Sequence, residues 1–336
     1  MDEKSDGKPY GKRMIVTFEC ETITPMFLRG ADGRTPELRA PSIKGAMRYW
    51  WRAINGHLSP KDLLATESAI FGGTDNKSGK SRVLLKVVNR PHWANEKYRP
   101  LPHHSGTNQC NIFLSDQSCK GRSPRDNTCT KGTLLPAYRE NNTFMLQVAF
   151  QKASKPGTEQ IMLSGTDWIK DILIVTFVLG GLGARSRRGF GSVAVKSIND
   201  SDFLMPDSLE VINAYLNRIN TSKNSEYFKL DQDSIKSTFP KNNYPVIREI
   251  KLGEPYMSMD KLLATIGNAS HQYNPTGSNY LGYARGKNRY ASQVYTSVLQ
   301  VVNNSTKQYI PIITTLSLDA LNDKNVIAFK GAILGV

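Results

Sequence analysis

The chain has 336 residues, of which 39% are hydrophobic and 22% charged, and its 44 Lys and Arg against 29 Asp and Glu give a net charge of +15. This length predicts one large or two medium domains, and the composition excludes a wholly disordered chain. The positive charge favours a polyanionic partner, nucleic acid before an anionic membrane surface. The longest apolar run, residues 172–183, is shorter than the ~20 residues of a membrane-spanning helix, and no apolar segment follows Met1, so we expect a cytoplasmic protein without a membrane partner.

The first half of the chain predicts an alternation of strands and helices. Proline and glycine punctuate the stretch 22–41 as a long loop, Ser42 is the expected cap of the helix that follows it, and Ser59 the expected cap of the next helix. Strands are expected at 13–20, 81–88, 144–150 and 191–198, and helices at 42–55, 60–71 and 167–180. Without the polar stretch 89–135, which has no clear period and is treated as an insertion, the order is β-α-β-β-α-β, the split ferredoxin-like unit.

The second half is also α+β but less regular. Helices are expected near 209–219 and 259–273, and strands at 244–252, 292–302 and 310–317. Residues 182–193 and 281–294 share a Leu-Gly start, an Ala-Arg pair and an aromatic and a serine before a strand, which suggests two related halves. The predicted domains are therefore residues 1–198 with the insertion 89–135, and residues 199–336.

Four cysteines are too few for a disulfide scaffold of this size. Cys20 lies in an apolar alternating run and is an expected core residue. The others fall in the polar insertion with two histidines and have no Cys-x-x-Cys spacing, which does not match the usual zinc patterns, so no metal or cofactor is assigned. Whether the insertion binds metal, forms a disulfide or is disordered stays open; its residues of interest are His103, His104, Cys110, Cys119 and Cys129.

The helix after Ser42 places three cations in one column. Lys44, Arg48 and Arg52 follow at i, i+4 and i+8 beside Trp51, whereas Trp50 falls in the apolar stripe. Because like charges in a column repel, a bound polyanion would relieve a penalty of a few tenths of a kcal/mol per pair. Backbone amides at the start of the helix could hold one phosphate. The alternative is a solvated face; in both cases we expect substitution of Arg48 and Arg52 to leave folding intact.

The segment 180–191 combines five glycines with Arg185, Arg187 and Arg188. Glycines allow close backbone approach to an anion, arginines supply planar donors, and Phe190 could stack on a base. The segment lacks the Gly-Lys-Ser/Thr of a Walker A loop and the glycine spacing of a dinucleotide fingerprint. The alternative is an ordinary glycine-rich turn with exposed arginines. Loss of all three arginines is expected to change stability by less than ~1 kcal/mol.

A restricted loop at 23–32 adds further cations, because Arg29 and Arg39 are expected near the start of the first helix. Asp32 in this loop could serve as a base or a metal ligand, but a turn residue is the favoured interpretation.

These motifs together resemble the RAMP superfamily of CRISPR systems. The glycine- and arginine-rich loop before a last strand carries the first resemblance, and the segments ITPMFLRGAD at 23–32 and PELRAPSIKGAMRYWWRA at 36–53 look like the first-numbered subunit family of the type III-B Cmr effector complex. The likeness covers residues 13–198, and the second half only through Arg285, Arg289 and 291–292. It implies two ferredoxin-like RAMP modules that face each other across a basic cleft.

The resemblance also implies a partner set and a site. The expected partners are CRISPR RNA near its 3′ end, target RNA and other Cmr RAMP subunits, in a complex whose target cleavage is credited to its repeated backbone subunit. The residues expected to face RNA are Arg29, Arg39, Lys44, Arg48, Trp51, Arg52, Arg185, Arg187, Arg188, Phe190, Arg285 and Arg289.

The favoured function is therefore a non-catalytic RNA-binding and assembly subunit. The alternative is a metal-independent RNA endonuclease of the RAMP class, which needs a general acid and base, usually including histidine. None of the five histidines lies in the basic motifs, which favours binding; they are His57, His92, His103, His104 and His271. A DNA-binding or membrane-surface protein fits the charge but not the motifs.

Overall fold

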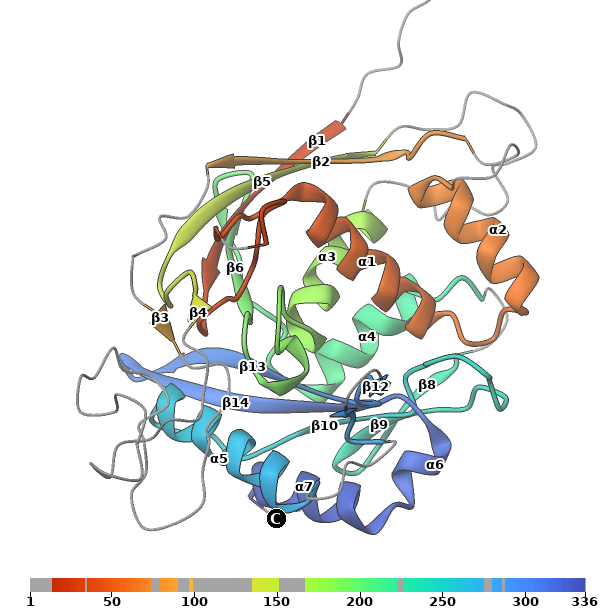
Figure 1. Ribbon diagram of the computed structural model, residues 1–336. Helices are drawn as coiled ribbons and strands as arrows, with labels where there is room; N and C mark the ends of the chain where they lie inside the picture. Colours follow the sequence, from red (N-terminus) through yellow and green to blue (C-terminus); the bar gives the residue numbers. More distant parts are fainter. Residues whose placement is uncertain are drawn as a thin grey trace, which may run out of the picture.

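A computed structural model of the chain describes residues 14–33, 35–73, 79–89, 97–98, 135–150, 167–222, 226–274, 280–285 and 288–335. The predicted insertion 89–135 lies almost entirely outside these residues, and with it the two histidines and three cysteines named above. The described part contains two antiparallel five-stranded sheets, two short two-stranded sheets and seven α-helices (Figure 1).

The first sheet has the strand order β2-β5-β1-β6-β7. Along β1 the side chains of Val16, Phe18 and Cys20 are buried while Ile15 points to the exposed face, because successive residues of a strand alternate between the two faces. This alternation confirms Cys20 as a core residue. The strands are β1 (Met14–Thr22), β2 (Val83–Asn89), β5 (Thr143–Phe150), β6 (Val193–Ile198) and β7 (Ser201–Asp202).

Helices α1 (Ala40–Ile54) and α3 (Asp167–Leu179) pack on the inner face of this sheet, and α2 (Pro60–Phe71) packs on α1. Ser59 caps α2 as predicted, with its side chain accepting a hydrogen bond from the Asp62 amide. The prediction that Ser42 caps α1 is wrong. The helix begins two residues earlier, with Arg39 in the cap position, because Pro41 fits the first helical turn and the Ser42 amide already donates to the Arg39 carbonyl.

The second sheet has the order β13-β14-β10-β9-β8. Its strands are β8 (Phe228–Asp231), β9 (Ser234–Ser237), β10 (Glu249–Leu252), β13 (Val294–Asn303) and β14 (Thr306–Thr315). The helices of this half are α4 (Leu209–Ile219), α5 (Met259–Gln272), α6 (Leu318–Leu321) and α7 (Lys324–Leu334). The two-stranded sheets are β3 (Lys97–Tyr98) with β4 (Leu135–Pro136), which are distant in the chain, and the hairpin of β11 (Tyr283–Arg285) with β12 (Asn288–Tyr290).

The two halves share their cores. In Figure 1, α1 and α3 lie between the two sheets, and α5 and α7 cover the far face of the second sheet. Helix α3 is buried from Ile172 to Leu179 because it contacts β6 on one side and β13 and β14 on the other. The larger apolar cluster joins α1 and α3 to Tyr295, Leu299 and Ile312 of the second sheet. Along α3 the halves therefore pack directly on each other.

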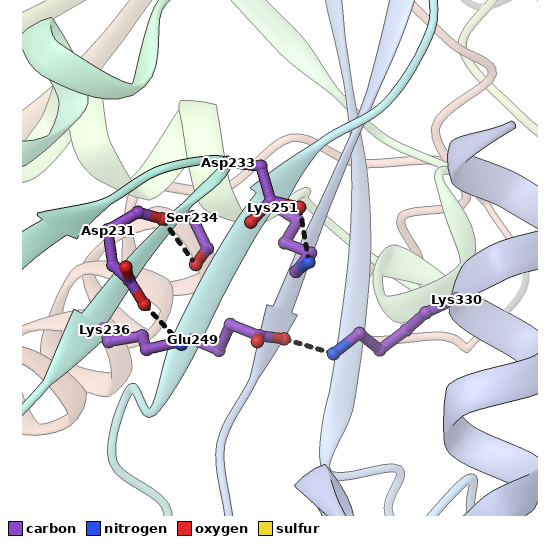
Figure 2. Close-up of polar contacts among 7 residues, drawn as sticks. All are labelled: Asp231, Asp233, Ser234, Lys236, Glu249, Lys251 and Lys330. Carbon is purple, nitrogen blue, oxygen red and sulfur yellow. Dashed lines mark hydrogen bonds and ion pairs between the residues drawn. The ribbon is translucent and has the colours of Figure 1, made fainter. Parts of the chain in front are cut away.

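A row of ion pairs fastens the outer part of the second sheet (Figure 2). Lys251 of β10 reaches Asp233 at 2.8 Å, and Lys236 of β9 reaches Asp231 at 2.5 Å. Lys330 of α7 forms an ion pair with Glu249 of β10, and both side chains are about nine-tenths buried. Removing one partner of such a buried pair would leave an uncompensated charge, so the pair fixes the position of α7 on the sheet.

The second half departs most from its prediction. The strand expected at 244–252 is formed only from Glu249 onward, because 240–248 is a loop around the buried guanidinium of Arg248. The two similar segments do not occupy equivalent places: 182–193 connects α3 to β6, whereas 281–294 follows α5 and forms the β11–β12 hairpin before β13. Instead of marking a repeat, the two segments touch each other through Arg187 and Arg188.

Candidate nucleic-acid interface

The cationic column on α1 is present on one side of the helix. Lys44, Arg48 and Arg52 are all partly exposed, and the side chains of the two arginines expose 35% and 37% of their area. The Lys44 amine donates to the Ser81 hydroxyl at 3.1 Å, at the start of β2. Burial and the neighbouring charge of Arg48 lower the pKa of Lys44, as expected for like charges on one face.

Glu67 of α2 is the counter-ion that the sequence analysis missed. Its Oε1 lies 2.6 Å from Arg48 Nε and 2.6 Å from Arg52 Nη1, and its side chain is only 4% exposed. The column therefore carries a bound carboxylate, and the expectation that both arginines are free of structural roles is wrong. The signal in the sequence is that Glu67 is the one charged residue in the otherwise uncharged stretch 63–71.

Trp51 does not join this face. Its indole is fully buried in the core with Trp50, so the prediction that it contacts RNA is wrong. The apolar stripe of α1 is wider than an amphipathic surface helix would need, because α2, α3 and β2 all pack against it.

The glycine-rich segment forms a tight turn against the first loop of the chain. The Ala184 amide donates to the Phe27 carbonyl, and a side chain at Gly183, where φ is +89°, would put Cβ 2.4 Å from that carbonyl oxygen. Gly189 and Gly191 also have positive φ, as does Arg185 at +63°. The glycines therefore meet a backbone requirement of the turn itself.

The three arginines of this turn have three different environments. Arg185 is exposed. Arg187 donates to the Ser292 carbonyl at 2.7 Å and stacks on the ring of Tyr295, with 4.7 Å between the guanidinium carbon and the ring centroid. Arg187 is thus partly exposed and also contacts the second half of the chain, a structural contact that the sequence did not predict.

Arg188 is partly buried against the second half of the chain. Its guanidinium donates to the carbonyls of Leu281, Val294 and Arg187 and to the Ser292 hydroxyl. Burial and the charges of Arg185 and Arg187 lower its pKa to about 10. These donors hold the segment 281–294 in place, so Arg188 has a structural role that the RNA-facing prediction did not include.

Phe190 is likewise buried, and its ring lies 5.2 Å from that of Phe27. The prediction that it stacks on a base is wrong. The residue enters the second apolar cluster, which joins the first loop of the chain to α5, β13 and α7.

Tyr49 connects the two cationic features. It lies between Arg52, one helical turn further along α1, and Arg187, whose guanidinium carbon is 5.8 Å from its ring centroid. Burial raises the pKa of its phenol, while the charges of Arg187 and Arg52 act in the opposite direction. We call Lys44, Arg48, Tyr49, Arg52 and Arg187 the arginine–tyrosine patch; it joins α1 to the glycine-rich turn, which the sequence alone did not bring together.

The remaining predicted cations lie apart from one another in sequence and environment. Arg29 is exposed and Arg39 half-buried, with its Nε buried and without a hydrogen-bond partner among the described residues. Arg289 is exposed on β12, and Arg285 ends β11. Asp32 accepts hydrogen bonds from the Thr35 amide and hydroxyl, which confirms the turn interpretation.

The described histidines and acids form no metal site. Within residues 14–335 as far as the structure describes them, no three of His, Cys, Asp and Glu gather closely enough to hold an ion. His57 stacks on Tyr227 with 5.0 Å between ring centroids, and its two ring nitrogens lie 3.3 Å from Asn220 and Thr221. In the same described ranges, no helix combines the length and apolarity that crossing a bilayer requires.

Known proteins share both the sequence and the fold. A family model described as the RAMP superfamily matches residues 19–194. The CRISPR system Cmr subunit Cmr1-2 of Pyrococcus furiosus is 29% identical over 197 residues, which are 54% of this chain and 96% of the relative. Subunit Cmr1-1 of the same organism is 30% identical over 185 residues, 54% of this chain, and the match spans about half (47%) of that relative's length.

Solved structures share the fold over nearly the whole chain. A chain from a type III-B Cmr-beta complex bound to cognate target RNA aligns over 96% of this chain and all of its own length, with a TM-score of 0.55 and 13% identity. A second chain, from a Cmr-beta complex bound to cognate target RNA and AMPPnP in the presence of ssDNA, aligns over 96% of this chain and 98% of its own, with a TM-score of 0.53 and 12% identity. These likenesses extend over both halves of the chain.

Proposed function

The chain belongs to the RAMP superfamily, and from that membership we propose that it is an RNA-binding, non-catalytic subunit of a type III-B CRISPR effector complex. In this role it contacts CRISPR RNA near its 3′ end, target RNA or both, and docks on other RAMP subunits of the Cmr complex. The names of its relatives and of the complexes that share its fold support the assignment to such a complex.

The observation that carries the RNA-binding part is the arginine–tyrosine patch. Arg187 of the glycine-rich turn and Arg52 lie near a partly exposed tyrosine, Lys44 and Arg48 continue the column of cations along α1, and Glu67 neutralises only part of this charge. Cations hold the phosphates of a single strand, and an aromatic ring between them can stack on a base. Further exposed or half-exposed cations are available for phosphate contacts: Arg29, Arg39, Arg185 and Arg289.

The strand order supports two ferredoxin-like modules. In the first sheet the order β6-β1-β5-β2 is that of a β-α-β-β-α-β unit in which the last strand lies beside the first. In the second sheet β10, α5, β13, β14 and α7 follow the same course, but the place beside β10 is taken by β9, which precedes β10 in the chain, with β8 at the edge. Since the two modules pack along α3, the basic RNA surface in this proposal lies at the rim of their contact and not in an open cleft along that helix.

A non-catalytic role fits the histidine that the structure places closest to α1. His57 follows the end of α1. Its ring stacks on Tyr227, and its two ring nitrogens contact the side chains of Asn220 and Thr221. A general base that accepts a proton from RNA needs a ring nitrogen free to face the scissile phosphate. The alternative, a metal-independent RNA endonuclease, is kept as the rival outcome of the test below.

The test is a titration of purified protein with a labelled single-stranded RNA at several salt concentrations. Because each neutralised phosphate releases counterions, the logarithm of the binding constant should fall with a slope of about −0.7 per phosphate contact. We expect a steep salt dependence, little dependence on RNA sequence and no cleavage with or without metal. Salt-insensitive binding would contradict the electrostatic assignment, and cleavage that persists with EDTA would favour the endonuclease. Co-purification with the other Cmr subunits tests the docking part.

A further inference from the structure

A pocket of about 310 Å³ opens at the end of the second sheet. Its walls come from three separate segments: residues 241–245 with Arg248, residues 291 and 293 after the β11–β12 hairpin, and residues 316–319 at the start of α6. This volume is at the lower end for pockets that bind small molecules, with room for one nucleotide. No part of the proposed RNA surface accounts for it.

Arg248 gives the pocket a buried positive charge. The residue is 97% buried, and its guanidinium donates to the carbonyls of Phe239 and Pro240 and to the Asn242 side chain. Those partners are neutral, and its Nε is buried without a hydrogen-bond partner among the described residues. A buried cation is ordinarily paired with an anion, so an uncompensated one at a pocket wall indicates a negatively charged ligand.

The other polar groups of the pocket fit a ligand with both an anionic and a neutral polar part. Lys241 is exposed at the rim and adds a second positive charge. Gln293 also lines the pocket, and its buried Oε1 has no hydrogen-bond partner among the described residues. Asp319 lines the rim as well, but no ion pair in the described residues joins it to Arg248.

The walls are held in position by residues of both halves. The Tyr244 hydroxyl donates to the Leu58 carbonyl and the Asn242 side chain to the Gly56 carbonyl, which fixes one wall to the loop between α1 and α2. Arg187 and Arg188 bond to Ser292, next to Gln293, which fixes the other wall. The pocket is thus preformed, and Ser292 links it to the arginine–tyrosine patch.

We propose that this pocket binds one nucleotide, with its phosphate at Arg248 and Lys241 and a base or ribose group at Gln293. Two sources share this chemistry: a free nucleoside monophosphate, or one nucleotide of the RNA that lies on the arginine–tyrosine patch. The second source rests on the proposed function; the charge argument for the pocket does not.

The experiment measures binding of AMP and of a short 5′-phosphorylated RNA by calorimetry. The variants are Lys241→Ala and Gln293→Leu, which leave Arg248 and its backbone contacts in place. Lys229→Ala is the matched control, because Lys229 is an exposed lysine on the β8 edge strand of the same sheet. We expect each pocket variant to weaken AMP binding by about tenfold or more, as for a lost charge-assisted or buried hydrogen bond, and the control to bind like the parent protein.

Competition separates the two sources. If AMP and the RNA compete and the pocket variants weaken both, the nucleotide comes from RNA; if the pocket variants weaken AMP alone, the ligand is free nucleotide. Absence of AMP binding, or AMP binding that is equal in the parent and both pocket variants, overturns the proposal. RNA binding that persists in that case leaves the proposed function standing, whereas AMP binding without any RNA binding refutes the function and retains the pocket.

Discussion

At the scale of single residues, Glu67 links stability to charge on the candidate interface. One buried oxygen holds both Arg48 and Arg52. Replacing either arginine by Gln leaves the other to pair with the carboxylate, so each single change should cost about 1 kcal/mol or less. Replacing both leaves a buried carboxylate without a cation, which should cost about 3–5 kcal/mol. Urea unfolding of the two single variants, the double variant and Lys44→Gln as control measures this, and additive costs would contradict it.

His57 should make stability depend on pH. Burial lowers its pKa below the ordinary value of 6.5. As pH falls, the unfolded chain therefore takes up a proton before the folded protein does, and the folded state loses stability from about pH 6.5 downward. The groups that face the ring, Tyr227, Phe239, Asn220 and Thr221, include no carboxylate, ammonium or guanidinium.

The measurement is the urea midpoint at pH 7.5 and 5.5 for the parent, His57→Gln and the control His271→Gln, an exposed histidine in the last turn of α5. We expect a smaller loss on acidification in His57→Gln than in the parent and the control. Equal losses in all three proteins would contradict the assignment.

The positions of the cations on α1 were predictable from the sequence, but the side chains that contact them were not. Lys44, Arg48 and Arg52 share a face as their i, i+4 spacing requires. Their counter-ion could not be predicted, because Glu67 reaches them only once α2 has packed against α1. Trp51 and Phe190 are aromatic residues beside arginines, which suggests base stacking, but tertiary packing buries both. Tyr49, which does lie between cations, carried no distinguishing signal.

At the scale of elements, two arginines of the glycine-rich turn should give different results on substitution: one change should weaken RNA binding and the other should lower stability. Arg185 is exposed and makes no described structural contact, so Arg185→Ala should change stability by less than about 0.5 kcal/mol while it weakens RNA binding. Arg188→Ala removes the donor for the Leu281 and Val294 carbonyls and should cost about 2–4 kcal/mol. Thermal unfolding beside RNA titration distinguishes the two; equal stability of both variants would contradict the different roles assigned to them.

Gly183→Ala provides the backbone control in the same turn. Its φ of +89° and the 2.4 Å approach of a Cβ to the Phe27 carbonyl oxygen should cost more than about 2 kcal/mol. This loss should appear without any change of charge.

Helices were more predictable than strands in this chain. The helices at α4 and α5 have clear amphipathic periods and serine caps, and both were predicted within one residue of their ends. The hairpin β8–β9 and helix α7 were missed. The strands of the hairpin are only four residues long, and α7 has apolar residues around most of its circumference, so neither shows a decisive period.

At the scale of the whole molecule, the division into residues 1–198 and 199–336 describes the order of the elements but not the packing. Both apolar clusters contain residues from the two halves. A fragment of residues 1–198 would expose the face of α3 that contacts β13 and β14, together with Trp50, whose ring lies 5.0 Å from that of Tyr295. We expect this fragment to be insoluble or to bind the dye ANS, in contrast to the full chain. A soluble fragment with a cooperative unfolding transition would support two independent domains.

The α+β class was predictable from the sequence because the first half alternates strands and helices in a regular order. The contact between the halves was not predictable, since α3 is apolar from Ile172 to Leu179 apart from Thr176, and its sequence does not show which surfaces cover it. A helix of this kind is typical of a position between two layers.

The position of α3 also has a consequence for synthesis on the ribosome. The helix ends at Leu179, and the strands that cover its second face begin at Val294, so this face stays uncovered while the intervening chain is made. Nascent chains of this length expose apolar surface for seconds at ordinary translation speed. Chains stalled before Val294 should therefore be held by chaperones, and release should coincide with the emergence of β14.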